Sequence, residues 1–428
     1  MNMTNYPLLD EKLYRKRLAN GLEVIVCPKP GFQRKVAYFM TSYGSIHTKF
    51  TLDGAVYETP EGVAHYLEHK MFDLPGRDVS EEFAALGANS NAFTSYDTTA
   101  YYFSCTENFS ECLKLLLTFV STPYFTGESV EKERGIIAQE ILMYNDAPDS
   151  RVFEDMMTLL YEHHPARNSI AGTVESIEKI TPEILYLCHR AFYNPANMVL
   201  CVAGDVDPEE VAAIAQDILP KQYRPAAVPD LGQKEKPVPV ELFSQRQMDV
   251  AMPTFQLGFK CQLPGVLGEG FARWELAAEL AAEALFGESS ELYLRLYEDG
   301  LVDSSFGGGL DTIDGLAMLV CGGDSNDPEE TWQRIADQVQ VILDQGIDDA
   351  AFARMKKSMM GRRVKDLDRF ESTCFRLCAY YFDKYDYFCF PELFAKVSKE
   401  EVLDFLRENV RTEYSAMSVV NPRDEVMQ

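Results

Sequence analysis

The stretch from Gly62 to Phe72, GVAHYLEHKMF, contains two histidines and a glutamate in the order His-x-x-Glu-His. On a helix, His65 and His69 stand at positions i and i+4 of one face, and Glu68 lies beside them. Residues 59–61, Thr-Pro-Glu, provide an N-cap and a proline suited to a first helical turn. The spacing therefore predicts a helix that directs two imidazoles and a carboxylate toward one place.

These side chains suggest a metal centre. Neutral imidazoles suit Zn²⁺, and a catalytic zinc keeps three protein ligands and one open position. The order His-x-x-Glu-His is the inverzincin motif. We therefore predict that His65 and His69 bind Zn²⁺ and that Glu68 is the general base of a hydrolytic reaction. The alternative is a pair of solvated histidines on an acidic helix.

A third ligand has to come from another part of the chain. The segment from Ser129, SVEKERGIIAQEILMYNDAP, has apolar residues at helical spacing. Glu133 and Glu140 are seven positions apart and so share one face of that helix. Without the histidine helix, two solvated glutamates on an exposed face would be the simpler interpretation.

HYLEH, followed by this pattern of two glutamates, resembles the M16 metallopeptidases, the family of insulinase, pitrilysin and mitochondrial processing peptidase. The resemblance implies that Glu140 is the third zinc ligand and that Glu133 supports the site from behind the ligands. The gap between His69 and Glu140 is a few positions shorter than expected for the family. The resemblance also implies an α+β fold of two tandem α/β-roll domains, each a mostly antiparallel sheet covered by helices.

The sequence GANSNAFTSYDTTAYYFSC predicts a hairpin with strands at residues 91–95 and 99–104. In the family that the chain resembles, the first of these strands is an exposed edge that pairs with the substrate backbone. The resemblance therefore implies that Asn91, Ala92 and Phe93 contact a peptide substrate. An internal hairpin without a ligand is the alternative.

Prolines gather around residues 220–240 and mark a change in composition. We predict a zinc-bearing domain at 1–222, a proline-rich linker at 223–240 and a metal-free domain of the same type at 241–428. In the second half a glycine-rich bend is expected at Gly307–Gly309. The long helix expected at residues 271–286 has no histidine, so one metal site is predicted.

Composition restricts the possible partners. The formal net charge of −27 argues against nucleic acid and against an anionic membrane surface. The N-terminus lacks an apolar signal core, and no run of 18 apolar residues occurs, which predicts a cytoplasmic protein without membrane contact. The ten cysteines lack the spacing of a disulfide framework or zinc ribbon and are predicted to be reduced and mostly buried.

The resemblance also implies that a second chain is needed for activity. Active M16 enzymes use two such bidomain halves, and the half without zinc supplies an arginine and, seven residues later, a tyrosine. Here Arg295 matches the arginine, but the later position is Val302. We therefore expect a related M16-type partner chain, with a homodimer as the second choice. The alternative is a binding or processing scaffold without turnover. The motifs look most like a bacterial subgroup that is linked by name to modification of elongation factor P.

Overall fold

The computed structural model describes residues 1–423. The chain forms two compact units, and each is assembled from three segments. The first unit comprises Met1–Ile141, Ser169–Leu231 and Arg362–Pro391, and the second comprises Leu142–Asn168, Gly232–Gly361 and the chain from Glu392 onward.

The first unit is built on a seven-stranded sheet with the order β1-β2-β3-β11-β4-β10-β9. Only β3 and β11 pair in parallel; the other neighbours are antiparallel. β9 pairs with β10 alone, so within the described residues it is an edge of the sheet. The strands are β1 (Asn2–Tyr6), β2 (Glu11–Arg17), β3 (Glu23–Pro28), β4 (Lys35–Thr41), β9 (Asn89–Thr94), β10 (Thr99–Cys105) and β11 (Met198–Gly204).

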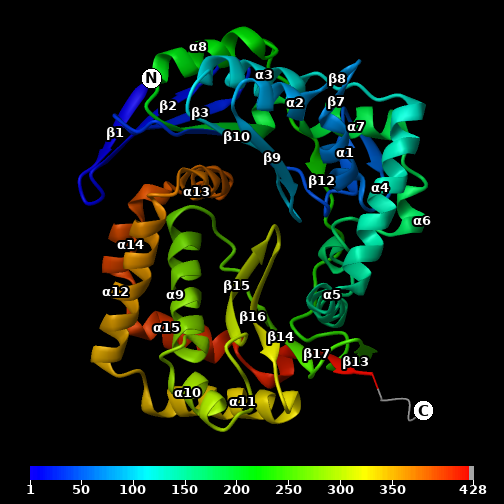
Figure 1. Ribbon diagram of the computed structural model, residues 1–428. Helices are drawn as coiled ribbons and strands as arrows, with labels where there is room; N and C mark the ends of the chain where they lie inside the picture. Colours follow the sequence, from blue (N-terminus) through cyan, green and yellow to red (C-terminus); the bar gives the residue numbers. More distant parts are fainter. Residues whose placement is uncertain (424–428) are drawn as a thin grey trace. The chain divides into compact units, whose positions relative to one another are not determined.

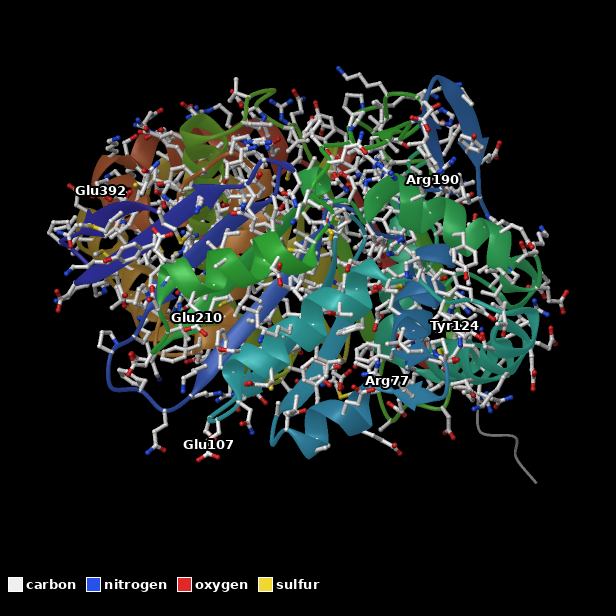
Figure 2. All side chains as sticks on the ribbon, turned by 90° about the horizontal axis from the view of Figure 1, so that it is seen from above. Arg77, Glu107, Tyr124, Arg190, Glu210 and Glu392 are labelled. Atoms are coloured by element: carbon white, nitrogen blue, oxygen red, sulfur yellow. The ribbon has the colours of Figure 1, made fainter. Side chains whose placement is uncertain are left out.

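Most helices of this unit cover one face of the sheet (Figure 1). They are α1 (Val63–Met71), α2 (Val79–Ala85), α3 (Phe109–Ser121), α4 (Gly127–Asp146), α6 (Val174–Ile177), α7 (Pro182–Phe192) and α8 (Pro208–Ile218). The inward residues of these helices and of alternate sheet positions, among them Phe39, Tyr101 and Leu117, form one hydrophobic core. Figure 2 looks onto this face, where α3 and α8 lie side by side and the Ser110 hydroxyl donates to Glu210 at 2.7 Å.

Smaller strand pairs complete this unit. They are β5 (Lys49–Leu52), β6 (Ala55–Glu58), β7 (Asp73–Leu74), β8 (Arg77–Asp78) and β12 (Val228–Pro229). β5 pairs with both β6 and β12, so part of the expected linker is a short strand attached to the first unit.

The opposite face of the sheet is covered by α13 (Phe370–Phe382), which packs on β11 and β4. Its buried side includes Cys374, Leu377 and Cys378, and together with Cys201 of β11 these thiols confirm the prediction of buried cysteines. Just beyond the helix, Asp386 accepts two hydrogen bonds from Arg15 of β2, at 2.7 and 2.8 Å. A helix from late in the sequence is thereby fixed to the N-terminal sheet.

The second unit has a five-stranded sheet with the order β13-β17-β14-β16-β15, in which only β13 and β17 are parallel. The strands are β13 (Phe243–Met248), β14 (Thr254–Cys261), β15 (Gly307–Ile313), β16 (Leu316–Asp324) and β17 (Ser415–Pro422). The helices are α5 (Pro148–Leu160), α9 (Glu269–Phe286), α10 (Glu291–Glu298), α11 (Pro328–Gln345), α12 (Asp349–Asp366), α14 (Phe390–Lys396) and α15 (Lys399–Asn409).

The compact units differ from the contiguous domains expected from the sequence, because two helices are exchanged. α5, from the N-terminal half, packs on β14 and β17, where Gly258 leaves room for Met156. Arg246 of β13 also binds Asp155 of α5 at 2.7 Å. α13, from the C-terminal half, belongs to the first unit. A division of the chain at the proline-rich segment would therefore separate α5 and α13 from the sheets that they cover.

The glycine-rich bend expected at Gly307–Gly309 is wrong, since these residues are part of strand β15. Gly308 serves packing, because a Cβ there would lie 2.5 Å from the ring of Phe286, at the end of α9. The absence of a side chain at Gly308 thus lets this helix approach the strand closely.

Candidate metal centre

Helix α1 begins at a residue that has to be glycine. Gly62 has φ of 83°, and a Cβ there would lie 2.3 Å from the carbonyl oxygen of Ala171. Thr59, expected as the N-cap, instead donates its hydroxyl to the carbonyl of Thr48 at 3.0 Å, so the cap prediction is wrong. The helix starts at Val63 because the left-handed glycine turns the chain there.

α4 lies beside α1 in the first unit (Figure 1). Its start is closed by Thr126 and Ser129, because the backbone N–H of each binds the other's hydroxyl. Val130 and Ile137 are buried in the core, and the Tyr66 hydroxyl of α1 donates to the carbonyl of Val130. These contacts direct the adjacent face of α4, with its two glutamates, toward the histidines.

The three predicted ligands come together. One donor atom each of His65, His69 and Glu140 lies within 4.8 Å of the others. Oε2 of Glu140 is 3.7 Å from Nε2 of His65 and 3.5 Å from Nε2 of His69. Ligands about 2 Å from a tetrahedral zinc are themselves about 3.3 Å apart, so the donor set and its spacing fit Zn²⁺.

Glu68 lies beside this group and is buried, with 9% of its surface exposed. Burial raises the pKa of its carboxyl to about 7, although His69 and a hydrogen bond oppose the shift. That bond comes from the Thr94 hydroxyl of β9, which donates to Oε2 at 3.2 Å. The carboxyl is therefore held in place and can both accept and release a proton near neutral pH.

Glu133 lies behind His69, away from the ligand group. Its Oε1 is 3.1 Å from Nδ1 of His69, and that hydrogen bond lowers the pKa of the Glu133 carboxyl. Its Oε2 is 3.8 Å from Nζ of Lys70, which is 1% exposed and binds Asp73 at 2.7 Å. With Nδ1–H donating to a carboxylate, Nε2 of His69 keeps its lone pair for a metal.

Two residues that contact the site were missed by the sequence analysis, Lys70 and Thr94. A lysine directly after the second histidine of the motif was one available signal. The strand alternation at Phe93 and Thr94 was another, since it places one of them on the face of Glu68.

β9 presents the predicted substrate contacts on both of its faces. Ala92 and Thr94 face α1 and Glu68, whereas Asn91 and Phe93 point to the other side of the sheet. The main chain of Asn91, Ala92 and Phe93 therefore forms an edge next to the candidate metal centre, with alternate side chains above and below.

The other histidines have structural partners. Nδ1 of His47 accepts the backbone N–H of Gly44 at 2.9 Å, and Nε2 of His189 is 3.0 Å from the carbonyl oxygen of Val120. In residues 1–423 the only group suited to a metal ion is His65, His69 and Glu140. Arg295 is exposed and pairs with Glu291 on its own helix, and Val302 is buried.

Comparison with known proteins agrees with this geometry. Residues 52–174 match the family model described as insulinase (peptidase family M16), and residues 179–359 match the M16 inactive domain. The uncharacterized zinc protease YmfH of Bacillus subtilis is 36% identical over 98% of both chains. The chain belongs to peptidase family M16. The resemblance seen in the motifs is thereby confirmed, including the bacterial subgroup, which is the YmfH type.

Solved structures show the same M16 fold. An M16-like protein from Alicyclobacillus acidocaldarius superposes with a TM-score of 0.92 at 35% identity, covering 96% of this chain and 99% of the other. A protease from Helicobacter pylori shares the fold, with a TM-score of 0.83 at 19% identity, covering 96% of this chain and 100% of that one. The predicted α+β class with two M16-type domains is confirmed. In the described part of the chain, no helix is long and apolar enough to cross a membrane.

Proposed function

We propose that this M16 chain is the zinc-bearing half of a cytoplasmic endopeptidase that hydrolyses short or unfolded peptides. The observation that supports this most strongly is the grouping of His65, His69 and Glu140 beside a buried carboxyl with a pKa near neutrality, Glu68. Relatives that are named zinc proteases also support zinc as the cofactor.

When bound by His65, His69 and Glu140, zinc would act as a Lewis acid on the attacking water and the peptide carbonyl. Glu68, whose buried carboxyl lies beside the three ligands, would take the proton of that water and later deliver it to the leaving amine. Thr94 holds Oε2 of Glu68 during this exchange. Glu133 fixes the ring of His69 so that Nε2 stays directed at the site.

The edge of β9 would hold the peptide. An added strand would gain main-chain hydrogen bonds along the open edge of β9 without regard to its own side chains. The N–H of Ala92, which now donates to Asn91 Oδ1 at 2.9 Å, would be one of the donors. Thr94 connects this edge directly to Glu68, so a peptide bond in the added strand lies next to the base. Unfolded or short chains can present such a strand, and folded proteins cannot.

A partner chain would complete the enzyme. Arg295 is already paired with Glu291, and the position seven residues later is the buried Val302, which has no hydroxyl. This chain therefore offers no arginine and tyrosine pair for a second copy of itself, which favours a related M16-type chain over a homodimer.

The proposal is tested by incubating the zinc-loaded full chain with a quenched mixed-peptide library, alone and with the related M16-type chain of the same organism. We expect cleavage that needs both chains and stops when a chelator removes zinc. Cleavage by the single chain would overturn the partner requirement. Zinc binding without cleavage in either arm would overturn the peptidase proposal and favour a binding scaffold.

A further inference from the structure

The sheet face opposite the metal centre carries a row of aromatic rings that ends at the edge strand. Tyr38 of β4 and Tyr102 of β10 are register partners, and their rings stack with centroids 4.4 Å apart at 11°. Phe93 of β9 follows, 6.4 Å from Tyr102 and 5.9 Å from Phe375 of α13. Phe375 is 40% exposed, so this large apolar ring is not part of a closed core.

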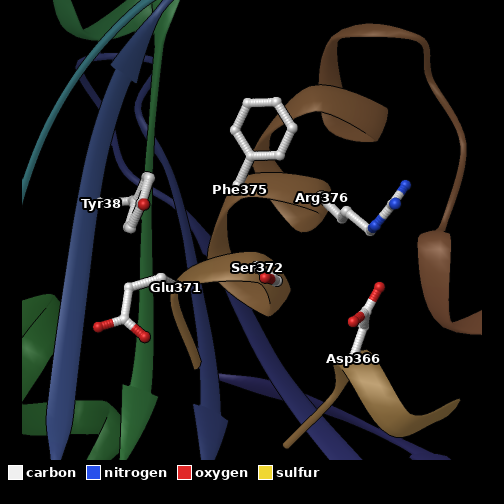
Figure 3. A pocket seen from close by; sticks show the side chains of 6 residues that line it. All are labelled: Tyr38, Asp366, Glu371, Ser372, Phe375 and Arg376. Atoms are coloured by element: carbon white, nitrogen blue, oxygen red, sulfur yellow. The ribbon is translucent and has the colours of Figure 1, made fainter. Parts of the chain in front are cut away.

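A cavity of about 300 Å³ continues from this row along α13 (Figure 3). In the figure, the Tyr38 ring lies on the strand side, and Phe375 and Glu371 project from the part of α13 nearest to it. Asp366, Ser372 and Arg376 form the remaining wall. All of these residues belong to the first unit, as does β9.

The charges around this cavity are of both signs. Glu371 forms an ion pair with Arg34, and Asp366 lies 3.9 Å from Arg369. The Arg376 guanidinium lies 5.7 Å from the centre of the Tyr387 ring. The cavity therefore has no large excess of charge of one sign, and Phe375 is the exposed ring in its wall.

Strand geometry connects this cavity with the peptide edge. In an antiparallel pair, directly opposite residues have Cβ atoms about 5 Å apart and point to the same face. A residue of an added strand opposite Phe93 would therefore face α13 and contact both Phe93 and Phe375. Its neighbours in the strand would face Glu68, because Thr94 does.

We propose that Phe93, Phe375 and the adjoining cavity form a specificity subsite for a bulky aromatic or long aliphatic side chain of a peptide bound along β9. This inference rests on the proposed function, since it takes the peptide strand on β9 as its starting point. It adds a substrate class: peptides that carry such a residue at one fixed distance from the scissile bond, on the strand face opposite the metal. Charged residues at that position are disfavoured, since the two rings that they would contact, Phe93 and Phe375, are apolar.

The test uses the full chain with its partner and a library of peptides randomised at each position, in two arms. The first arm measures cleavage by the wild type, Phe375→Ala and Phe93→Ala. The second measures which peptides are retained by the zinc-loaded Glu68→Gln chain and by its double variant with Phe375→Ala. Phe32→Ala is the matched control, because Phe32 is an exposed ring that packs on Phe370 at the start of α13.

We expect a preference for aromatic and long aliphatic residues at one position in both arms. Phe375→Ala should reduce that preference about fivefold, which is within the range for one aromatic pair, and leave the other positions unchanged. Phe32→Ala should leave it intact. Retention without this preference, or a preference unaffected by Phe375→Ala, would overturn the subsite. Selective retention without any cleavage would support the subsite and overturn only the proposed peptidase activity.

Discussion

Glu133 offers a quantitative test of the site, because it binds the back of a proposed ligand without touching the metal position. In Glu133→Gln the shape is kept, and the amide oxygen can still accept from Nδ1 of His69. The amide NH₂ would then face Nζ of Lys70, where Oε2 now lies at 3.8 Å, so one donor would oppose another. Loss of such outer partners weakens metal binding about 10- to 100-fold.

Because the hydrogen bond to His69 can be retained, we expect the lower end of this range, a loss of about tenfold or about 1.4 kcal/mol in zinc binding. The assay is a competition titration of the metal-free chain against a chromophoric zinc chelator. Glu128→Gln is the matched control, since it makes the same change of charge at an exposed position in the first turn of α4. Zinc affinity of Glu133→Gln within twofold of the wild type, or an equal loss in the control, would refute the positioning role.

Three further predictions concern residues around the site and the fold. Lys70→Met removes the buried ammonium that binds Asp73 and faces Glu133, so the same zinc titration should show severalfold weaker binding. Urea denaturation should show a stability loss of about 3 kcal/mol, because removing one partner leaves the other buried charge uncompensated; unchanged zinc affinity would make the role purely structural. Asp386→Asn breaks the bidentate pair with Arg15 and should lower the free energy of unfolding by about 2 kcal/mol in urea denaturation, whereas an unchanged midpoint would show that α13 is held without it. Burial lowers the pKa of His189 to about 4, so the unfolded state binds its proton first on acidification. His189 should therefore contribute about 2 kcal/mol to the change in stability of the metal-free chain between pH 7 and pH 5, and a stability profile in His189→Gln with the same slope as the wild type would contradict this assignment.

The local grouping of the candidate site residues follows from their spacing in the sequence. The spacing of His65 and His69 requires only a helix to bring the imidazoles together, and the seven-residue spacing of Glu133 and Glu140 works in the same way. The edge position of β9 came from resemblance to the family. The prediction that α1 lies beside α4 also came from that resemblance, because the periodicity of a helix does not show which other helix it packs against.

The remaining differences between the predicted and the observed structure depend on contacts between residues far apart in the sequence. The apolar faces of α5 and α13 show that each helix packs on a sheet, but a hydrophobic face does not specify which sheet. The strand Glu11–Arg17, EKLYRKR, was missed because its charged residues hide the alternation. Lys70 has the composition of a surface residue and is buried only because Asp73 and Glu133 surround its ammonium.

The measurement that tests the central claim most directly compares zinc content and peptide cleavage in Glu68→Gln and wild type, each with the partner chain present. We predict that the variant binds one zinc per chain, as the wild type does, and that its cleavage rate falls at least about 100-fold, the usual contribution of a general base. Glu58→Gln, an exposed glutamate upstream of α1, should keep full activity. Cleavage by Glu68→Gln at the wild-type rate, or a wild-type chain without zinc, would contradict the account.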